Sequence, residues 1–248
     1  LRILRLYRFA ARFGFAIDPA TGAAARALGP HLDCVSAERI QEELLKLLAA
    51  PRPGSYLEPA VLAVILPELE PEKQPERFAE LCRTIDRIEP TAENVPARLA
   101  ALLCPLGEAG ARKALRKLKC SNALTDEVTA LEREAGGGAG SFLLGHESGH
   151  SIARPIACGN RVPPQRTVLG ETPGTPNTTL TVQAKRLLGR YELPTIKRLT
   201  ALCSARHPEQ TRAFAALRAE AERLTAENAC CRVSQLAVNG RDLMAAGV

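Results

Sequence analysis

LRILRLYRFAARFGF, residues 1–15, and VSAERIQEELLKLL, residues 35–48, are the two stretches that give this chain its character. At about 100° per residue, the first stretch places four arginines within roughly a 120° arc of a helix: Arg2, Arg5, Arg8 and Arg12. Most of the remaining circumference is apolar: Ile3, Leu4, Leu6, Tyr7, Ala10 and Phe13. We therefore expect a helix with a cationic stripe and a buried face, ended by Gly14.

Two further helices are predicted before residue 50. The first covers residues 19–28, with Asp18 as its N-cap and a proline in its first turn. The second is capped by Ser36, and in it Arg39 and Glu43 stand four residues apart, a spacing that favours an ion pair. A stripe of arginines is also typical of an ordinary solvated helix face, so the pattern alone leaves both interpretations open.

The composition indicates a soluble, helical protein of one or two domains. Of the 248 residues, 46% are hydrophobic, enough to bury a substantial core, but only 4% are aromatic and none is Trp. A net charge of +6 favours a polyanionic partner, although such an excess is common in proteins that bind no nucleic acid. The chain has no run of eighteen apolar residues and starts with a basic amphipathic helix. We therefore expect no membrane partner and a cytoplasmic location.

The order of periodic and irregular segments predicts an all-α fold in four parts. Residues 1–50 hold the helices just described, and residues 51–135 continue with five segments of helical length and period. Residues 136–181 are rich in Gly, Pro and Thr without a sustained period, which is typical of a linker or a disordered insertion. Residues 182–248 return to the helical pattern and predict a smaller second bundle.

Two patterns that often mark metal sites are present without the context that they need. HESGH, residues 146–150, has the HExxH spacing of zinc proteases, but its Ser-Gly centre and the GGG run before it disfavour the helix that this motif requires. The eight cysteines lack a CxxC spacing, so we expect free thiols. No metal-ligating residue is assigned.

The two N-terminal stretches together resemble the neck region of the family that contains the CCA-adding tRNA nucleotidyltransferases and the bacterial poly(A) polymerases. Members carry an EDxxR motif that runs into a helix reading nearly as residues 1–15 do, and Arg2 matches its arginine. Another similarity is at residues 238–248, VNGRDLMAAGV, which look like the boundary between the family's body and tail. Members also carry an ERhxxE motif, with h apolar, which this chain matches in full: Glu38, Arg39, Ile40 and Glu43.

The resemblance implies a fragment, namely a helical neck and body with part of a tail and without the catalytic head domain. The Glu and Asp of the EDxxR motif would stand before residue 1. So would the carboxylates that hold two metal ions for the attack of the RNA 3′-hydroxyl on the α-phosphate. We therefore expect a need for Mg²⁺ only together with the missing head domain of the same polypeptide, and no catalysis by this chain alone.

The same resemblance implies roles for the neck residues. The family's EDxxR arginine reads the base edge of CTP or ATP, a role that Arg2 inherits by position, and planar guanidinium donors suit such an edge. The other arginines of the stripe are candidates for triphosphate or RNA phosphate contacts, with Arg5 placed at the nucleotide and Arg8 and Arg12 at the phosphates. The ERhxxE residues are expected to support the neck: Glu38, Arg39 and Glu43.

The predicted function is the RNA-binding and nucleotide-selecting part of an enzyme that adds CCA to tRNA 3′ ends from CTP and ATP. Two alternatives stay open: a poly(A) polymerase of the same family, and a non-catalytic helical protein that binds RNA. Basic groups at residues 112–119 and 185–198 either follow the tRNA backbone or form solvated helix faces.

One departure from the family pattern lies at LAALLCPLG, residues 99–107. Many members carry a His-Asp metal-binding dyad at the comparable point, where this chain has Cys104 and Pro105. Proline offers no metal ligand, and neither an imidazole nor a carboxylate is present. A phosphohydrolase centre of this type is therefore not expected.

Overall fold

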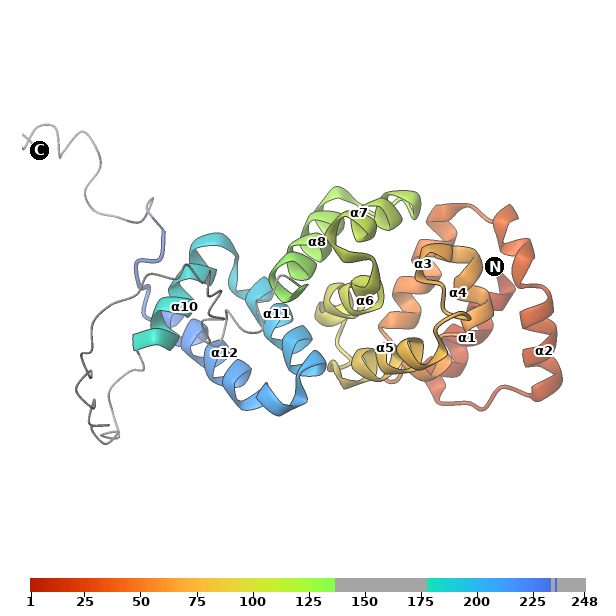
Figure 1. Ribbon diagram of the computed structural model, residues 1–248, viewed down its shortest axis with the longest axis horizontal. Coiled ribbons are helices and arrows are strands. Elements are labelled where there is room, and N and C mark those ends of the chain that lie inside the picture. Colours follow the sequence, from red (N-terminus) through yellow and green to blue (C-terminus); the bar gives the residue numbers. More distant parts are fainter. Residues whose placement is uncertain (137–177, 233–234, 236–248) are drawn as a thin grey trace, which may run out of the picture.

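The computed structural model describes residues 1–136, 178–232 and 235. In these residues the chain forms eleven α-helices joined by short 3₁₀ turns, and no β-strand occurs among them (Figure 1). The all-α prediction is therefore confirmed. None of the helices in these ranges has the length and apolar character that a membrane span requires. The HExxH spacing at 146–150 and the similarity at 238–248 lie outside the described residues.

The N-terminal helices begin and end where local sequence signals predict. The α1 helix ends because Gly14 adopts a left-handed conformation (φ 70°), which glycine accepts without a steric penalty. The α2 helix begins where the Asp18 carboxylate accepts a hydrogen bond from the Thr21 N–H at 2.9 Å. Ser36 occupies the N-cap position of α3, but its side chain makes no capping hydrogen bond. The elements of this part are α1 (Arg2–Phe13), α2 (Pro19–Ala27), η1 (Gly29–Cys34) and α3 (Ala37–Leu48).

Five helices follow, close to the five predicted segments: α4 (Pro59–Ile65), α5 (Pro75–Arg87), α6 (Val95–Leu103), α7 (Gly107–Lys117) and α8 (Asn122–Gly136). The α6 helix is the central one, because every residue from Ala97 to Leu103 is buried. Five helices pack around it, namely α3, α5, α7, α8 and α11 (Leu193–Arg206). A helix that is apolar on nearly all sides is stable only inside such a core.

One charged residue lies within this central helix. Arg98 is fully buried, and burial lowers the pKa of its guanidinium. It donates hydrogen bonds to the carbonyls of Leu48 and Ala50, both at 2.6 Å, and of Ile88 at 2.5 and 3.1 Å. These carbonyls stand at the C-terminal ends of α3 and α5, where helices leave acceptors unpaired and favour a cation. Arg98 thereby ties two helix ends to the core.

Gly54 fixes the turn between α3 and α4. Its N–H donates to Asp86 Oδ1 at 2.7 Å, and a Cβ at this position would overlap the backbone carbonyl of Cys82. Glycine therefore lets the 3₁₀ turn η2 (Gly54–Tyr56) lie directly on α5.

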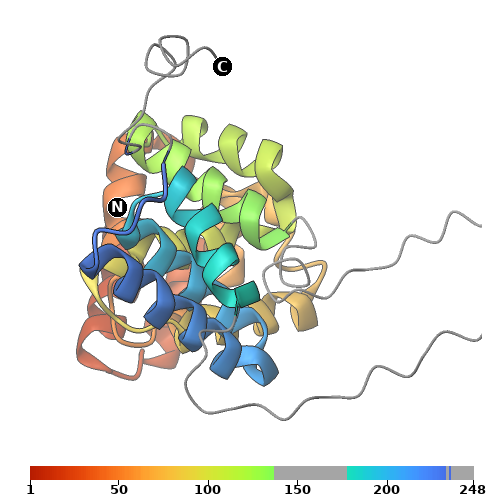
Figure 2. The same cartoon turned by 90° about the vertical axis from the view of Figure 1, so that its left-hand side faces the viewer.

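The last group of helices shares the core of the others. It consists of α10 (Thr178–Arg190), α11 and α12 (Thr211–Ala226), and α11 packs against both α6 and α8. One hydrophobic core runs through all the groups, although the sequence predicts a second bundle at this point. Figure 1 shows the groups in a row, with α1 and α2 at one end and α10 and α12 at the other, and Figure 2 looks along this row.

The predicted irregular segment, 136–181, is bounded by helices. The α8 helix includes Gly136 at its end, and α10 starts at Thr178, so residues 178–181 are helical where the sequence pattern predicts a linker. Tertiary contact explains this difference, because Leu180 packs against the core and the Thr181 hydroxyl donates to Glu220 of α12 at 2.6 Å. Residues 137–177 lie outside the described ones, and for them the linker stays a prediction.

Candidate nucleic-acid interface

The predicted neck residues lie on two helices that pack along each other. The α1 helix buries Leu4, Tyr7 and Ala11 in the core, and α3 contributes Ile40 and Leu44 to the same core. Packing of two amphipathic helices fixes how the polar residues beside the apolar faces meet. The arginines of α1 are thereby brought next to the acidic residues of α3.

Glu43 of α3 receives two arginines of α1. Its Oε1 accepts a hydrogen bond from Arg5 Nε at 3.1 Å, and its Oε2 lies 2.7 Å from Arg8 Nε, an ion pair without hydrogen-bond geometry. Glu43 is only 5% exposed. A carboxylate buried to this degree is costly without cations beside it, so Glu43 and the two arginines hold one another in place.

This arrangement differs from the ion pair that the sequence spacing favours. Arg39, four residues before Glu43, is exposed, and it makes no ion pair within the part of the chain that the structure describes. The prediction of an Arg39–Glu43 pair is wrong, because the partners of Glu43 come from another helix. Glu38 is exposed in the first turn of α3, where a carboxylate stabilises the helix N-terminus.

The four arginines of α1 differ in how far they reach solvent. The Arg5 side chain is 54% exposed despite its bond to α3, whereas that of Arg8 is 14% exposed. Arg2 and Arg12 are exposed, and neither forms an ion pair among the described residues. The helix therefore presents three accessible guanidinium groups and one that is largely covered.

Phe13 does not belong to the buried face of α1, so the prediction that it packs inward is wrong. It is exposed, whereas the buried face of the helix ends earlier, with Ala10 and Ala11. The sequence period places Phe13 on the apolar side of the helix. It does not indicate at which residue the rest of the protein ceases to pack against that side.

A polar cavity of about 240 Å³ lies beside α1, and Tyr7, Arg26 and Glu58 are among the residues that line it. Arg26 Nη1 lies 3.5 Å from the Glu58 carboxylate, and the Tyr7 hydroxyl donates to the same carboxylate at 3.5 Å. Burial, followed by the charge of Glu58, raises the pKa of Tyr7, which keeps its hydroxyl a neutral donor. The cavity therefore offers both donors and acceptors to a ligand.

The basic group at residues 112–119 is partly neutralised within the protein. Arg112 donates to Asp126 at 3.0 Å and to Thr129 at 2.9 Å, and Lys117 pairs with Glu68 at 3.8 Å. Within the described ranges, three cations of the group are exposed without ion pairs: Lys113, Arg116 and Lys119.

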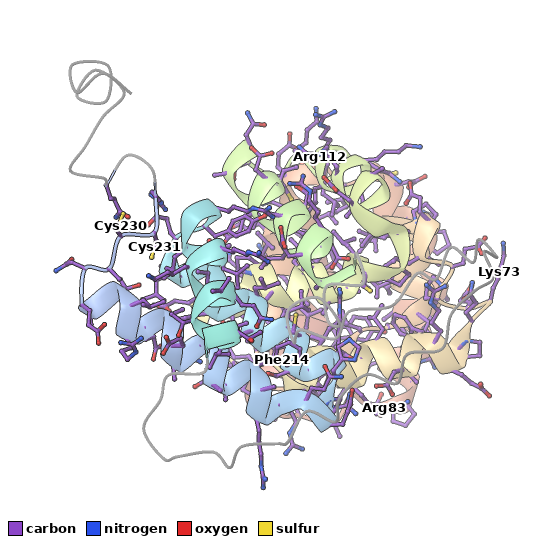
Figure 3. The ribbon with its side chains drawn as sticks, turned by 60° about the vertical axis from the view of Figure 1, so that its left-hand side comes forward. Lys73, Arg83, Arg112, Phe214, Cys230 and Cys231 are labelled. Atoms are coloured by element: carbon purple, nitrogen blue, oxygen red, sulfur yellow. The ribbon has the colours of Figure 1, made fainter. Side chains whose placement is uncertain are left out.

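A wider cationic groove lies between α10 and the stretch that follows α12. Its volume is about 720 Å³, and Figure 3 shows Cys230 and Cys231 at this end of the molecule, beside α10. Four basic side chains line the groove: Lys185, Arg186, Arg190 and Arg232. The first three belong to the basic group predicted at 185–198. Arg232 was missed, because it comes from more than forty positions further along the chain.

The other two cations of that group point elsewhere. Lys197 pairs with Glu222 at 3.0 Å, and Arg198 pairs with Glu127 of α8. These two residues hold helices together. Two cations of the groove are also paired, Arg190 with Glu134 at 3.6 Å and Arg232 with Glu192 at 2.7 Å.

Cys104 and Pro105 occupy a 3₁₀ turn, η5 (Cys104–Leu106), directly after α6. The charged side chains near Cys104 include Arg206 and Glu132, which form a largely buried ion pair at 2.6 Å, and Arg77. Burial raises the pKa of Glu132, although Arg206 acts against this shift. Across the described residues, no three His, Cys, Asp or Glu side chains come together in a group that could hold a metal ion.

Comparison with known proteins relates the neck to RNA-binding sequences. Residues 14–73 match the family model described as the probable RNA and SrmB-binding site of polymerase A. The match includes Glu43 and the polar cavity residues Arg26 and Glu58. A CC-adding tRNA nucleotidyltransferase of Synechocystis sp. is 46% identical over 57 residues, which are 23% of this chain and 14% of the relative.

Two longer alignments point to the same group of enzymes. A CCA-adding enzyme of Leuconostoc citreum is 34% identical over 110 residues, 44% of this chain and 27% of the relative. A multifunctional CCA protein of Chromobacterium violaceum is 35% identical over 125 residues, 44% of this chain and 31% of the relative. The chain thus spans between 14% and 31% of the length of these relatives. No solved structure matches the chain.

Proposed function

We propose that this chain, which belongs to the family of CCA-adding tRNA nucleotidyltransferases and bacterial poly(A) polymerases, is the RNA-binding and nucleotide-selecting part of an enzyme. This enzyme would add CCA to tRNA 3′ ends. The substrates would be CTP, ATP and tRNA. The observation that carries the proposal is the arginine stripe of α1. Arg5 and Arg8 of this stripe are anchored by the buried Glu43, which lies within the RNA-binding match at 14–73.

Each neck residue has a proposed role, and the positions of Arg2, Arg5, Arg12 and Glu43 fit theirs best. Arg2 and Arg5 bind the incoming nucleotide, because both guanidinium groups reach solvent and their planar donors suit a base edge or a triphosphate. Arg12 contacts RNA phosphates, and Arg8 does so while it is held against α3. The ERhxxE residues support the helix pair: Glu38, Arg39 and Glu43.

The nucleotide-adding chemistry is assigned to a head domain of the same polypeptide. Two-metal nucleotidyl transfer needs clustered carboxylates for Mg²⁺, and the described residues hold no such cluster. The part of this chain in the reaction is to hold tRNA and to present guanidinium donors to the nucleotide.

The proposal is tested with the polypeptide that joins this chain to its proposed head domain, acting on a tRNA transcript that lacks CCA. We expect incorporation of CMP and AMP. Arg2→Ala should lower the preference for CTP and ATP over GTP and UTP by about 1 to 3 kcal/mol, the value of one good base contact. Arg83→Ala, which removes an exposed arginine of α5, is the matched control and should leave the preference unchanged. Failure of the unaltered polypeptide to add either nucleotide would contradict the proposal.

A poly(A) polymerase is the second candidate, because the matching family model is described for polymerase A. The length of the product on the same tRNA decides between them. Three added nucleotides support CCA addition, and a long homopolymer supports poly(A) synthesis. If neither product forms but the chain binds tRNA in a salt-dependent manner, the non-catalytic RNA-binding protein is the remaining alternative.

A further inference from the structure

Three phenylalanines at the end of α1 are exposed next to one another. Their exposed fractions are 44% for Phe9, 57% for Phe13 and 62% for Phe15. Large apolar side chains are usually buried, and a cluster of exposed ones marks a binding surface. Among the described residues, the other exposed large hydrophobic side chains lie elsewhere in the chain, at Leu28 and Val182.

The rings form a stack whose geometry follows from the helix and its end. Phe9 and Phe13 are four residues apart on α1, with ring centroids 6.1 Å apart and planes 8° apart. The left-handed turn at Gly14 then brings Phe15 to a centroid distance of 5.5 Å from Phe13, at 25°. The Phe15 N–H donates to the Ala10 carbonyl at 3.1 Å, which fixes this turn.

Cations accompany the stacked rings. The guanidinium carbon of Arg8 lies 4.1 Å from the centroid of Phe9, and that of Arg12 lies 5.9 Å from the centroid of Phe13. Both distances are in the range of cation–π contacts. The surface therefore combines aromatic faces with positive charge.

We propose that Phe9, Phe13 and Phe15 form a stacking platform for unpaired bases of RNA, with Arg12 binding the phosphates that connect them. The proposal rests on the proposed function, because it takes RNA as the partner. Every nucleobase has a π-face, so a platform of this kind holds single strands with little dependence on sequence. Such a site suits an unpaired RNA 3′ end, which must be held near the nucleotide-selecting arginines.

The charge of the helix favours a nucleic acid over a second copy of this chain. Residues 1–17 contain four arginines and no acidic residue. A second copy that docked through the same face would bring the unpaired charges of Arg2 and Arg12 close to their counterparts, which opposes association. A polyanion that carries planar rings satisfies both the charge and the aromatic surface.

The test uses the 248-residue chain and short single-stranded oligoribonucleotides that contain 2-aminopurine, a base whose fluorescence falls when it stacks. A second oligonucleotide replaces that base by an abasic site and keeps every phosphate. The variant Phe13→Leu keeps an apolar side chain but removes the ring. Leu28→Ala is the matched control, because Leu28 is 51% exposed and lies at the end of α2.

We expect the 2-aminopurine signal to fall on binding, and the abasic oligonucleotide to bind about 5- to 140-fold more weakly per stacked base. Phe13→Leu should remove most of this difference and leave the salt dependence of binding unchanged. Leu28→Ala should change neither quantity.

The platform is overturned if the abasic and the intact oligonucleotide bind equally well, or if Phe13→Leu keeps the quenching. It is also overturned if sedimentation velocity shows that the phenylalanines hold two copies together. In the first two cases RNA binding through phosphates persists and the proposed function stands. Absence of binding to any RNA would instead contradict the proposed function itself.

Discussion

At the scale of single residues, the chain buries charge in two different ways. Glu43 is balanced by the guanidinium groups of Arg5 and Arg8. Arg98 is held by three backbone carbonyls instead, and no carboxylate of the described residues forms an ion pair with it. In both cases the buried polar atoms depend on one another, so that removing one leaves the others without partners.

Replacing Arg98 by methionine should destabilise the fold by about 2 to 4 kcal/mol. Three buried carbonyls lose their donor, and the removal of a desolvated charge offsets only part of that loss. Urea unfolding followed by circular dichroism at 222 nm measures the change. Arg116→Met, on the exposed face of α7, is the control and should stay within about 0.5 kcal/mol of the unaltered chain. Equal stabilities of the two variants would contradict the role of Arg98.

Replacing Glu43 by glutamine should separate support of the neck from RNA binding. The amide keeps the shape but loses the charge that faces two arginines, so the free energy of unfolding should fall by about 1 to 3 kcal/mol. Affinity for tRNA at constant salt should not fall. The substitution removes the negative charge of Glu43, so the arginine stripe becomes more positive towards phosphates. Glu42→Gln is the matched control, since Glu42 is exposed and pairs with Lys46 one turn on. A loss of tRNA affinity in the Glu43 variant larger than its loss of stability would argue that Glu43 touches RNA itself.

At the scale of helices and turns, the sequence predicts ends better than partners. Gly14 and Asp18 predict where α1 ends and α2 begins, because capping acts within a few residues. The inward position of Glu43 and the exposed position of Phe13 depend on which helix packs alongside, and sequence spacing within one helix does not contain that information. Arg98 is a similar case. The local sequence VPARLAALL does not indicate that this arginine will be buried and hydrogen-bonded to the carbonyls of three residues from other parts of the chain.

The stability of the fold should depend on pH through Glu220, whose carboxylate accepts hydrogen bonds from Arg223 of its own helix, α12, and from Thr181 of α10. Hydrogen bonds from Arg223, followed by that from Thr181, lower the pKa of Glu220 to about 2. A carboxylate with a lowered pKa stabilises the fold above its ordinary value of about 4.5 and loses this contribution as pH falls towards 2. The contribution should be on the order of 1 kcal/mol, because solvent screens charges near the surface.

Unfolding measured between pH 5 and pH 2.5 checks this dependence, with pH limits chosen around the reference values of carboxylates. Glu220→Gln should show a smaller loss of stability on acidification than the unaltered chain. Glu72→Gln, which changes an exposed carboxylate in the turn before α5, should keep the original pH dependence. Identical pH profiles for all three proteins would contradict the assignment to Glu220.

At the scale of the whole molecule, two cationic surfaces lie at opposite ends of the row of helices (Figure 1). One is the arginine stripe of α1, and the other is the groove beside α10. The proposed partner, a folded tRNA, offers phosphates over a far larger surface than an oligonucleotide of a few residues. The two surfaces should therefore contribute separately to the binding of tRNA.

Salt dependence measures these contributions. Lys185→Ala combined with Arg186→Ala should reduce the slope of log K against log salt for tRNA by about 1.4 to 1.8, since each neutralised phosphate contributes about 0.7 to 0.9. The slope for a short single strand bound at α1 should not change. Arg83→Ala serves as the control for a general loss of positive charge. An unchanged slope for tRNA in the double variant would exclude the groove from the interface.

The helices that precede Gly136 and those that follow Thr178 are joined by the packing of α11 on α6 and α8. Their association therefore does not depend on the covalent link between Gly136 and Thr178. The ion pairs Arg198–Glu127 and Arg206–Glu132 and the shared apolar core would hold them as a complex. The molecule is therefore a natural candidate for a split protein, in which two separately produced pieces reassemble by complementation. We expect cleavage between Gly136 and Thr178 to change the chain's connectivity and to leave the packing of the described helices in place.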